Sequence, residues 1–326
     1  MQVKKILIFS RHGLRYPLTN NSDISNWLHE YKLGDLTDKG EIFEYLFGKK
    51  LKKMLNIHDE ENVLFISNSM RRTYLTAKIL AQAIIPYKNS KINMKHQDFN
   101  KFDDRFNFLV KNKNIYTNEM TEKVDKRLKP VYDKMEEILS LEKGSISSDK
   151  TNILVEDDGF LVVNGAIRRA TDICDSFLLQ YYEGYSKDDI FKSDNFISDL
   201  KLMTTAKDEF LDLLFANDEF IDNSKVNICH LVGEELFNYD NKVTLIVGHD
   251  SNLSTLMKKF NVNYVYPNDI SIEKYPVGAK LIFKIFDDNS YEIYYSYFKY
   301  EDIRNMNAEN PVMILIKQGE NIENIC

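Results

Sequence analysis

The sequence places a histidine between two arginines in the segment RHGLRYP at 11–17. Two guanidinium groups can hold a phosphate through directional, charge-assisted hydrogen bonds. Their positive charge also opposes protonation of His12, which keeps the imidazole neutral and able to attack phosphorus. Gly13 carries no side chain that could block this attack. The segment therefore predicts a nucleophilic His12 in a phosphate site formed by Arg11 and Arg15.

The elements that must position this segment follow from the apolar pattern. Short apolar runs at 3–9, 63–66 and 243–247 predict buried strands, each followed by a polar turn. Amphipathic helices are expected after Thr37, a candidate N-cap, and at 70–85. This alternation predicts an α/β fold, a three-layer core with a central, mostly parallel sheet. Ligands of such sheets bind at the carboxyl ends of the strands, where the histidine lies.

The middle of the chain has a different pattern. Long amphipathic segments, with a hairpin around 157–159, predict a smaller, mainly helical insertion over 107–215. The alternation then resumes, and a hairpin is expected within 280–298. We therefore expect an α/β core of residues 1–106 and 216–326, with the insertion packed on it as a lid.

The composition excludes several classes of protein. The net charge is -7 and the sequence pI is near 5.5, so the chain lacks the basic balance that nucleic acids and membrane surfaces select. We expect neither partner, and an anionic substrate must be drawn in by local basic residues. The sequence does not determine the oligomeric state.

Targeting and cysteine content bear on the compartment. No apolar stretch approaches the roughly 18 residues of a membrane-spanning helix, and no leader is visible. A cytoplasmic protein is expected, with a periplasmic or secreted one, its leader removed, as the alternative. The odd set of Cys174, Cys229 and Cys326 has no zinc-site or disulfide spacing. At least one unpaired thiol is expected, and Cys174 is expected in the core.

The motifs resemble those of one family, the histidine acid phosphatases. The pattern RHGxRxP at 11–17 resembles the family signature, and His249-Asp250 after 243–247 resembles its His-Asp pair. Arg72 in SNSMRRTYLTA resembles its additional phosphate-binding arginine. The segments LTDKG, LQYYEGYSKDD and GHDSNL are similar to the family's bacterial glucose-1-phosphatase subgroup.

This resemblance implies a mechanism. His12 becomes a phosphohistidine, and Asp250 protonates the leaving oxygen. The phosphoryl oxygens are bound by Arg11, Arg15, Arg72 and His249. No metal and no other cofactor is expected, because the arginines supply the positive charge that divalent ions supply elsewhere. An acid pH optimum is expected, since Asp250 must hold a proton.

The substrate implied is a small-molecule phosphate monoester, with sugar phosphates such as glucose-1-phosphate first. Glu183, in the QYYEG segment, is predicted to face the pocket, where it would bind sugar hydroxyls and repel densely phosphorylated substrates. The alternative is a solvated glutamate at a helix end. Leu18 stands where many phytase-like relatives carry a threonine, which weakens the assignment as an inositol phosphate phosphatase.

Two other classes remain as alternatives. A phosphotransferase of the phosphoglycerate mutase type shares the RHG start but typically lacks the rest of the signature and the His-Asp pair. A catalytically inactive phospholigand-binding module is possible on the same fold, yet every expected catalytic position is filled. Phosphate release from a simple aryl phosphate distinguishes an enzyme from such a module.

Overall fold

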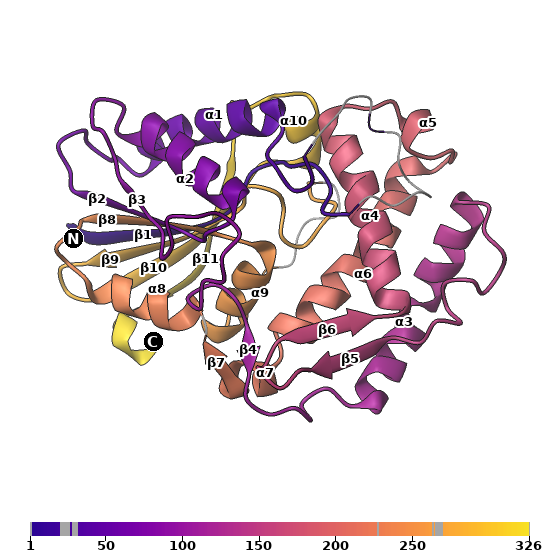
Figure 1. Cartoon of the computed structure of the whole chain (residues 1–326). Coiled ribbons are helices and arrows are strands. Elements are labelled where there is room, and N and C mark those ends of the chain that lie inside the picture. The colour runs from indigo at the N-terminus through magenta and orange to yellow at the C-terminus, as the bar shows by residue number, and fades with distance from the viewer. Residues whose placement is uncertain are drawn as a thin grey trace.

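The computed structural model describes residues 2–19, 27, 32–226, 228–262, 264 and 270–325. Within them, a seven-stranded sheet forms the centre of the molecule, with the order β11-β10-β9-β1-β8-β2-β3 (Figure 1). Its strands are β1 (Val3–Arg11), β2 (Val63–Ser67), β3 (Ile92–Asn93), β8 (Val243–Gly248), β9 (Lys280–Phe286), β10 (Tyr291–Tyr297) and β11 (Val312–Gly319). The strands β1, β8, β2 and β3 are parallel, and β9, β10 and β11 extend the sheet in antiparallel fashion.

Helices cover both faces of this sheet. α1 (Asp38–Met54) and α2 (Arg71–Ile84) lie on one face, and α8 (Ile228–Phe237) and α9 (Asp250–Lys259) lie on the other (Figure 1). Because both faces are covered, β8 is buried along its whole length and reads as a continuous apolar run. The expected α/β fold with a three-layer core is confirmed.

Local signals in the sequence set the position of α1. The Thr37 side chain accepts a hydrogen bond from the backbone N–H of Gly40, so it caps the helix as expected. Gly48 lets α2 approach closely, because a Cβ at this position would lie 2.6 Å from the Cβ of Ala83. The pair α1 and α2 therefore forms one tightly packed layer.

A second group of elements forms a helical lobe beside the sheet (Figure 1). It contains α3 (Asn118–Ile138), β5 (Asn152–Val155), β6 (Leu161–Asn164), α4 (Ala166–Glu183), α5 (Lys187–Ile190) and α6 (Phe196–Phe215). The strands β5 and β6 form the hairpin expected around 157–159. Near the base of the lobe lie β4 (Leu109–Val110), α7 (Asp218–Asn223) and β7 (Ser224–Val226), and β4 pairs with β7. We propose that the insertion comprises residues 107–215.

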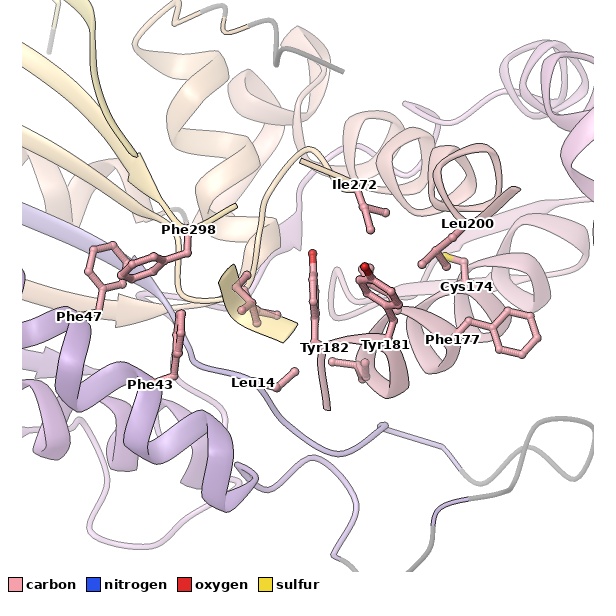
Figure 2. Close-up of a cluster of buried hydrophobic side chains, with 14 of the residues drawn as sticks. Leu14, Phe43, Phe47, Cys174, Phe177, Tyr181, Tyr182, Leu200, Ile272 and Phe298 are labelled. Atoms are coloured by element: carbon pink, nitrogen blue, oxygen red, sulfur yellow. The ribbon is translucent and has the colours of Figure 1, made fainter. Parts of the chain in front are cut away.

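Buried apolar side chains join this lobe to the core. Figure 2 shows Tyr181 and Tyr182 of α4 in one cluster with Phe43 and Phe47 of α1 and with Phe298. The ring centroids of Phe43 and Phe298 are 4.6 Å apart. Such continuous burial excludes water between lobe and sheet, so the lobe is a packed part of the molecule.

Several features differ from expectation or were absent from it. β11 and the short helices α10 (Tyr300–Arg304) and η1 (Ile322–Asn324) were not expected. β11 is an edge strand that is buried only in part, so its sequence lacks the continuous apolar run of β8. The resumed alternation includes α8, which begins at Ile228, after β7. In the part of the chain that is described, no helix is long and apolar enough to cross a membrane. Cys174 and Cys229 are buried and unpaired, and Cys326 lies outside the described residues.

Candidate active site

The ends of β1 and β8 bring the two histidine motifs together. The strands are parallel neighbours, and Arg11 pairs with Gly248 at their carboxyl ends. The backbone N–H of His12 donates to the Gly248 carbonyl at 3.0 Å. The rings of His12 and His249 then meet edge to face with centroids 5.5 Å apart. The parallel pairing of β1 and β8 therefore brings the two motifs to one edge of the sheet.

His12 is held in one tautomer and kept neutral. Its Nδ1 lies 2.8 Å from the Gly13 carbonyl oxygen, which can only accept, so Nδ1 carries the proton and the lone pair remains on Nε2. Burial lowers the pKa of His12 well below its usual value, and the guanidinium groups nearby, Arg72 first, lower it further. His12 is therefore a neutral imidazole with Nε2 ready to attack.

Gly13 is needed for the close packing of α1 against the loop that carries His12. A Cβ at this position would lie 2.7 Å from Cγ of Glu44 in α1. Glu44 is buried and accepts a hydrogen bond from Lys280 at 2.8 Å. The glycine therefore allows α1 to pack under the nucleophile loop, a role that the sequence did not reveal.

A cavity of about 410 Å³ contains the reactive groups. Among the described residues, its lining includes His12, Arg15, Arg72, His249 and Asp250. Burial, and then Arg15, lowers the pKa of Arg72 to about 9, so Arg72 stays a cation at neutral and acid pH. Five of the six catalytic and phosphate-binding residues predicted from the sequence thus converge on one cavity.

Arg11 is the sixth, and it lies behind the cavity lining. Its guanidinium is fully buried, and Nη1 donates to Glu273 at 3.0 Å and to the Tyr275 carbonyl. Its Nη2 forms an ion pair with Asp250 at 3.1 Å. Arg11 therefore orients the predicted general acid, a role that its place in the sequence motif did not reveal.

Four buried guanidinium nitrogens lack a hydrogen-bond acceptor among the described residues. They are Nε of Arg11, Arg15 and Arg72, and Nη2 of Arg11, which is only ion-paired with Asp250. Buried N–H donors are almost always paired, so an unpaired set requires an explanation. An oxyanion bound in the cavity would supply acceptors for such donors.

Sequence reasoning missed a group of buried charges from the lobe and a loop. Lys207 of α6 lies 2.9 Å from Asp175 of α4 and 3.1 Å from Glu273. Asp175 also forms an ion pair with Arg15 at 2.9 Å. A lysine and an aspartate on amphipathic helices are ordinarily solvated, and the sequence gives no sign that these two are buried.

The charge of Asp250 depends on these neighbours. Burial raises the pKa of Asp250, but Arg11 and then Lys207, 3.7 Å away, outweigh burial and hold the pKa well below its usual range. The carboxyl group is therefore ionised in the free enzyme. A phosphate anion in the cavity offsets the cations, which favours the protonated acid.

His249 is fixed by contacts on both ring nitrogens. The side-chain amide of Asn68 lies 2.8 Å from its Nε2, and Nη2 of Arg72 lies 3.4 Å from its Nδ1. The backbone N–H of His249 donates to the Asn252 side chain at 3.0 Å, at the start of α9. Asn68 directly follows β2, and its position at a strand end is the signal that could have identified it.

Glu183 is not brought to this cavity. Its carboxylate accepts a hydrogen bond from Thr37 at the start of α1, and it is absent from the described cavity lining. The reason lies in the end of α4, where the Tyr182 carbonyl accepts from Lys39 and the Tyr181 carbonyl accepts from Arg304. These contacts turn the end of α4 toward α1 and α10, so the geometry gives no support to a substrate-selecting Glu183.

Cavity size alone does not locate the site. A larger cavity of about 660 Å³ lies along α8 and includes Cys229 and His230. The described lining of this larger cavity contains no arginine. The smaller cavity is the candidate active site because it contains the predicted nucleophile, His12, together with the cations Arg15 and Arg72.

Known proteins with similar sequences are phosphatases. No family model matches the chain. A glucose-1-phosphatase of Providencia rettgeri is 25% identical over 327 residues, which cover 88% of this chain and 77% of the relative. A glucose-1-phosphatase of Salmonella typhimurium is 24% identical over 349 residues, covering 94% and 84%.

Solved structures show the same fold. The phytase of Citrobacter braakii has a TM-score of 0.81 at 17% identity and covers 97% of this chain and 92% of its own. The apo phytase of Hafnia alvei has a TM-score of 0.79 at 17% identity, covering 98% and 91%. In its motifs, fold and relatives, the chain resembles the histidine acid phosphatases, α/β enzymes that hydrolyse phosphate esters. Among these enzymes, it is similar to the bacterial glucose-1-phosphatases.

Proposed function

We propose that this phosphatase hydrolyses phosphate monoesters in two steps through a phosphohistidine at His12. Nε2 of His12 attacks phosphorus, the bond to the leaving oxygen breaks, and Asp250 donates a proton to that oxygen. Water then attacks the phosphohistidine, Asp250 accepts a proton from it, and inorganic phosphate and neutral His12 are released. The observation that carries the proposal is the set of unpaired guanidinium N–H donors around a neutral, buried histidine.

The phosphate-binding groups have distinct roles. We assign Arg15, Arg72 and His249 to the phosphoryl oxygens because they line the cavity with His12. Arg11 contributes its Nε and its charge from behind while it holds Asp250. The fixed positive charges of the three arginines stabilise the charge that develops on the oxygens during transfer.

The proton on Asp250 has a defined source. Because the free enzyme holds Asp250 ionised, we propose that the proton enters with the substrate. A phosphate monoester has a second pKa of about 6, so its monoanion is abundant below that pH. Because the substrate monoanion brings the proton, we expect the rate of hydrolysis to be highest at acid pH.

The name of the relatives indicates the first substrates to test. Glucose-1-phosphate is tested because the sequence relatives are named for its hydrolysis, and inositol hexakisphosphate is tested because the structural neighbours are phytases. A phosphate-release panel with sugar phosphates, nucleotides and phosphotyrosine decides among them. Dependence on a bisphosphoglycerate primer would instead indicate a mutase.

The nucleophile is tested by trapping. Enzyme labelled with radioactive phosphate ester should keep the label after a base quench and lose it after an acid quench, since phosphohistidine is acid-labile. His12→Ala should abolish labelling and turnover. His58→Ala, at an exposed histidine, is the matched control and should label normally. An active His12→Ala enzyme would refute the mechanism.

We also propose a reducing compartment. Cys174 and Cys229 are buried and unpaired, which is typical of cytoplasmic proteins. Cell fractionation, with a periplasmic marker in parallel, tests this location against export.

A further inference from the structure

The cavity wall beyond the phosphate-binding residues is apolar and aromatic. Among the described residues, this wall includes five phenylalanines, Phe106, Phe108, Phe160, Phe210 and Phe215. The ring centroids of Phe108 and Phe215 are 4.6 Å apart, and those of Phe210 and Phe215 are 6.5 Å apart. The leaving group of a substrate bound at His12 must lie against this wall.

The polar groups of the wall are few. Outside the predicted catalytic and phosphate-binding residues, they are Asn107, Arg168 and Ser251 in the described lining. Arg168 is already paired, with Nη2 3.1 Å and Nε 3.2 Å from the carboxylate of Asp172. A sugar with several hydroxyl groups would lose its hydration and find few partners here. A second phosphate would meet a cation that is already neutralised.

The exposed side chains that line the cavity are also apolar. Leu18 and Phe160 both line the cavity, and their exposed fractions are 44% and 37%. Apolar side chains that gather around a cavity and remain in contact with water mark a binding surface. A cavity of about 410 Å³ can hold one ring together with a phosphate.

We propose that this wall is a leaving-group subsite for an aromatic ring, so that the preferred substrates are phosphate monoesters of ring-bearing alcohols or phenols. This inference rests on the proposed hydrolysis at His12 and narrows its substrate class. Aromatic rings pack edge to face or offset against phenylalanines, and such pairs add stabilisation beyond the area they bury. Sugar phosphates and inositol phosphates are then secondary substrates.

The test compares substrates whose leaving groups are all primary alkoxides. Ethyl phosphate, benzyl phosphate and glucose-6-phosphate differ mainly in what the subsite contacts. We expect kcat/KM for benzyl phosphate to exceed that for ethyl phosphate by about tenfold or more. Glucose-6-phosphate should be no better than ethyl phosphate. A kcat/KM for glucose-6-phosphate equal to or above that for benzyl phosphate would overturn the subsite.

Substitutions in the cavity wall test whether these phenylalanines cause the preference for benzyl phosphate. Phe160→Ala and Phe210→Ala should lower the benzyl-to-ethyl ratio of kcat/KM by about threefold to tenfold. Phe99→Ala is the matched control, since Phe99 is 39% exposed and is absent from the described lining. An unchanged ratio in both cavity variants would reject the wall as the cause. Failure to hydrolyse all three substrates, with no labelled His12, would instead reject the proposed function itself.

Discussion

At the scale of single residues, the site is a balance of buried charges. Arg11 and Lys207 face the carboxylates of Asp250 and Glu273 in a volume that water barely reaches. Each buried charge is tolerated because it has a partner of opposite sign. A phosphate that enters this balance changes the proton affinity of Asp250, and binding and acid catalysis are coupled in that way.

Because the charge of Lys207 affects the pKa of Asp250, we expect substitution of Lys207 to change the pH dependence of kcat. Lys207→Met removes a cation 3.7 Å from Asp250, and loss of a nearby cation raises the pKa of a carboxyl group. Asp250 then keeps its proton to higher pH in the substrate complex. The falling alkaline limb of kcat should move up by about one pH unit.

Two controls accompany the pH profile. Lys207→Arg should restore the parent profile. Lys201→Met changes a lysine on the same helix whose Nζ lies 5.3 Å from the centroid of the Tyr300 ring. An alkaline limb that stays in place in Lys207→Met would show that Asp250 is insensitive to this cation. Circular dichroism establishes that the variant is folded.

The role of Asp250 as general acid is tested with substrates whose leaving groups differ in basicity. Asp250→Asn should reduce hydrolysis of a sugar phosphate by about 10²–10⁴-fold, because an alkoxide needs a proton as it leaves. p-Nitrophenolate leaves nearly unaided, so p-nitrophenyl phosphate should lose far less. Rates on both substrates are measured with one enzyme preparation, and equal losses would reject the assigned role.

At the scale of elements, helix ends fix the geometry. Thr37 caps α1 and donates to Glu183 at the end of α4, so one hydroxyl ties two helices from distant parts of the chain. Burial raises the pKa of Glu183, and its charged form depends on donors such as Thr37. The cap is therefore part of the contact between lobe and core.

Thr37→Ala should destabilise the protein more than an ordinary cap does. Loss of an N-cap costs about 0.5–2 kcal/mol, and Glu183 also loses its donor. Thr117, which caps α3 by accepting from Met120, gives the control Thr117→Ala. Free energies of unfolding from urea titrations compare the two. Equal losses would mean that the Thr37–Glu183 bond adds nothing.

The place of Glu183 also changes its expected effect on specificity. Because its carboxylate is bound at α1 and not in the described cavity lining, Glu183→Ala should leave the ratio of kcat/KM for glucose-1-phosphate and inositol hexakisphosphate unchanged. Thermal stability should fall. A rise in activity on the hexakisphosphate alone would restore the substrate-selecting role that the sequence predicted.

At the scale of the whole molecule, the lobe is part of the site. α4 and α6 supply Asp175 and Lys207, which pair with Arg15 and Glu273 of the remaining chain. Tyr182 belongs to the apolar cluster of Figure 2, and its hydroxyl donates to Glu273 at 3.2 Å. Lobe and sheet are thus joined by packing and by buried charge together.

The sequence by itself determined the elements and the reactive motifs. Apolar runs identified β1, β2 and β8 because buried strands must be continuously apolar, and the strand ends placed His12, Arg72 and His249-Asp250 near one edge. These signals are local, so they can be read without the rest of the fold. The family resemblance added roles to the same residues.

Only the tertiary structure decided which charges are buried together. Lys207 and Asp175 look like solvated helix residues, and their pairing with Arg15 and Asp250 depends on contacts between segments far apart in the chain. The same holds for Glu183, whose carboxylate accepts a hydrogen bond from Thr37 at the start of α1 and is absent from the described cavity lining. Burial and partners are properties of the packed molecule, and they set the pKa of Asp250 and the chemistry of the leaving-group wall.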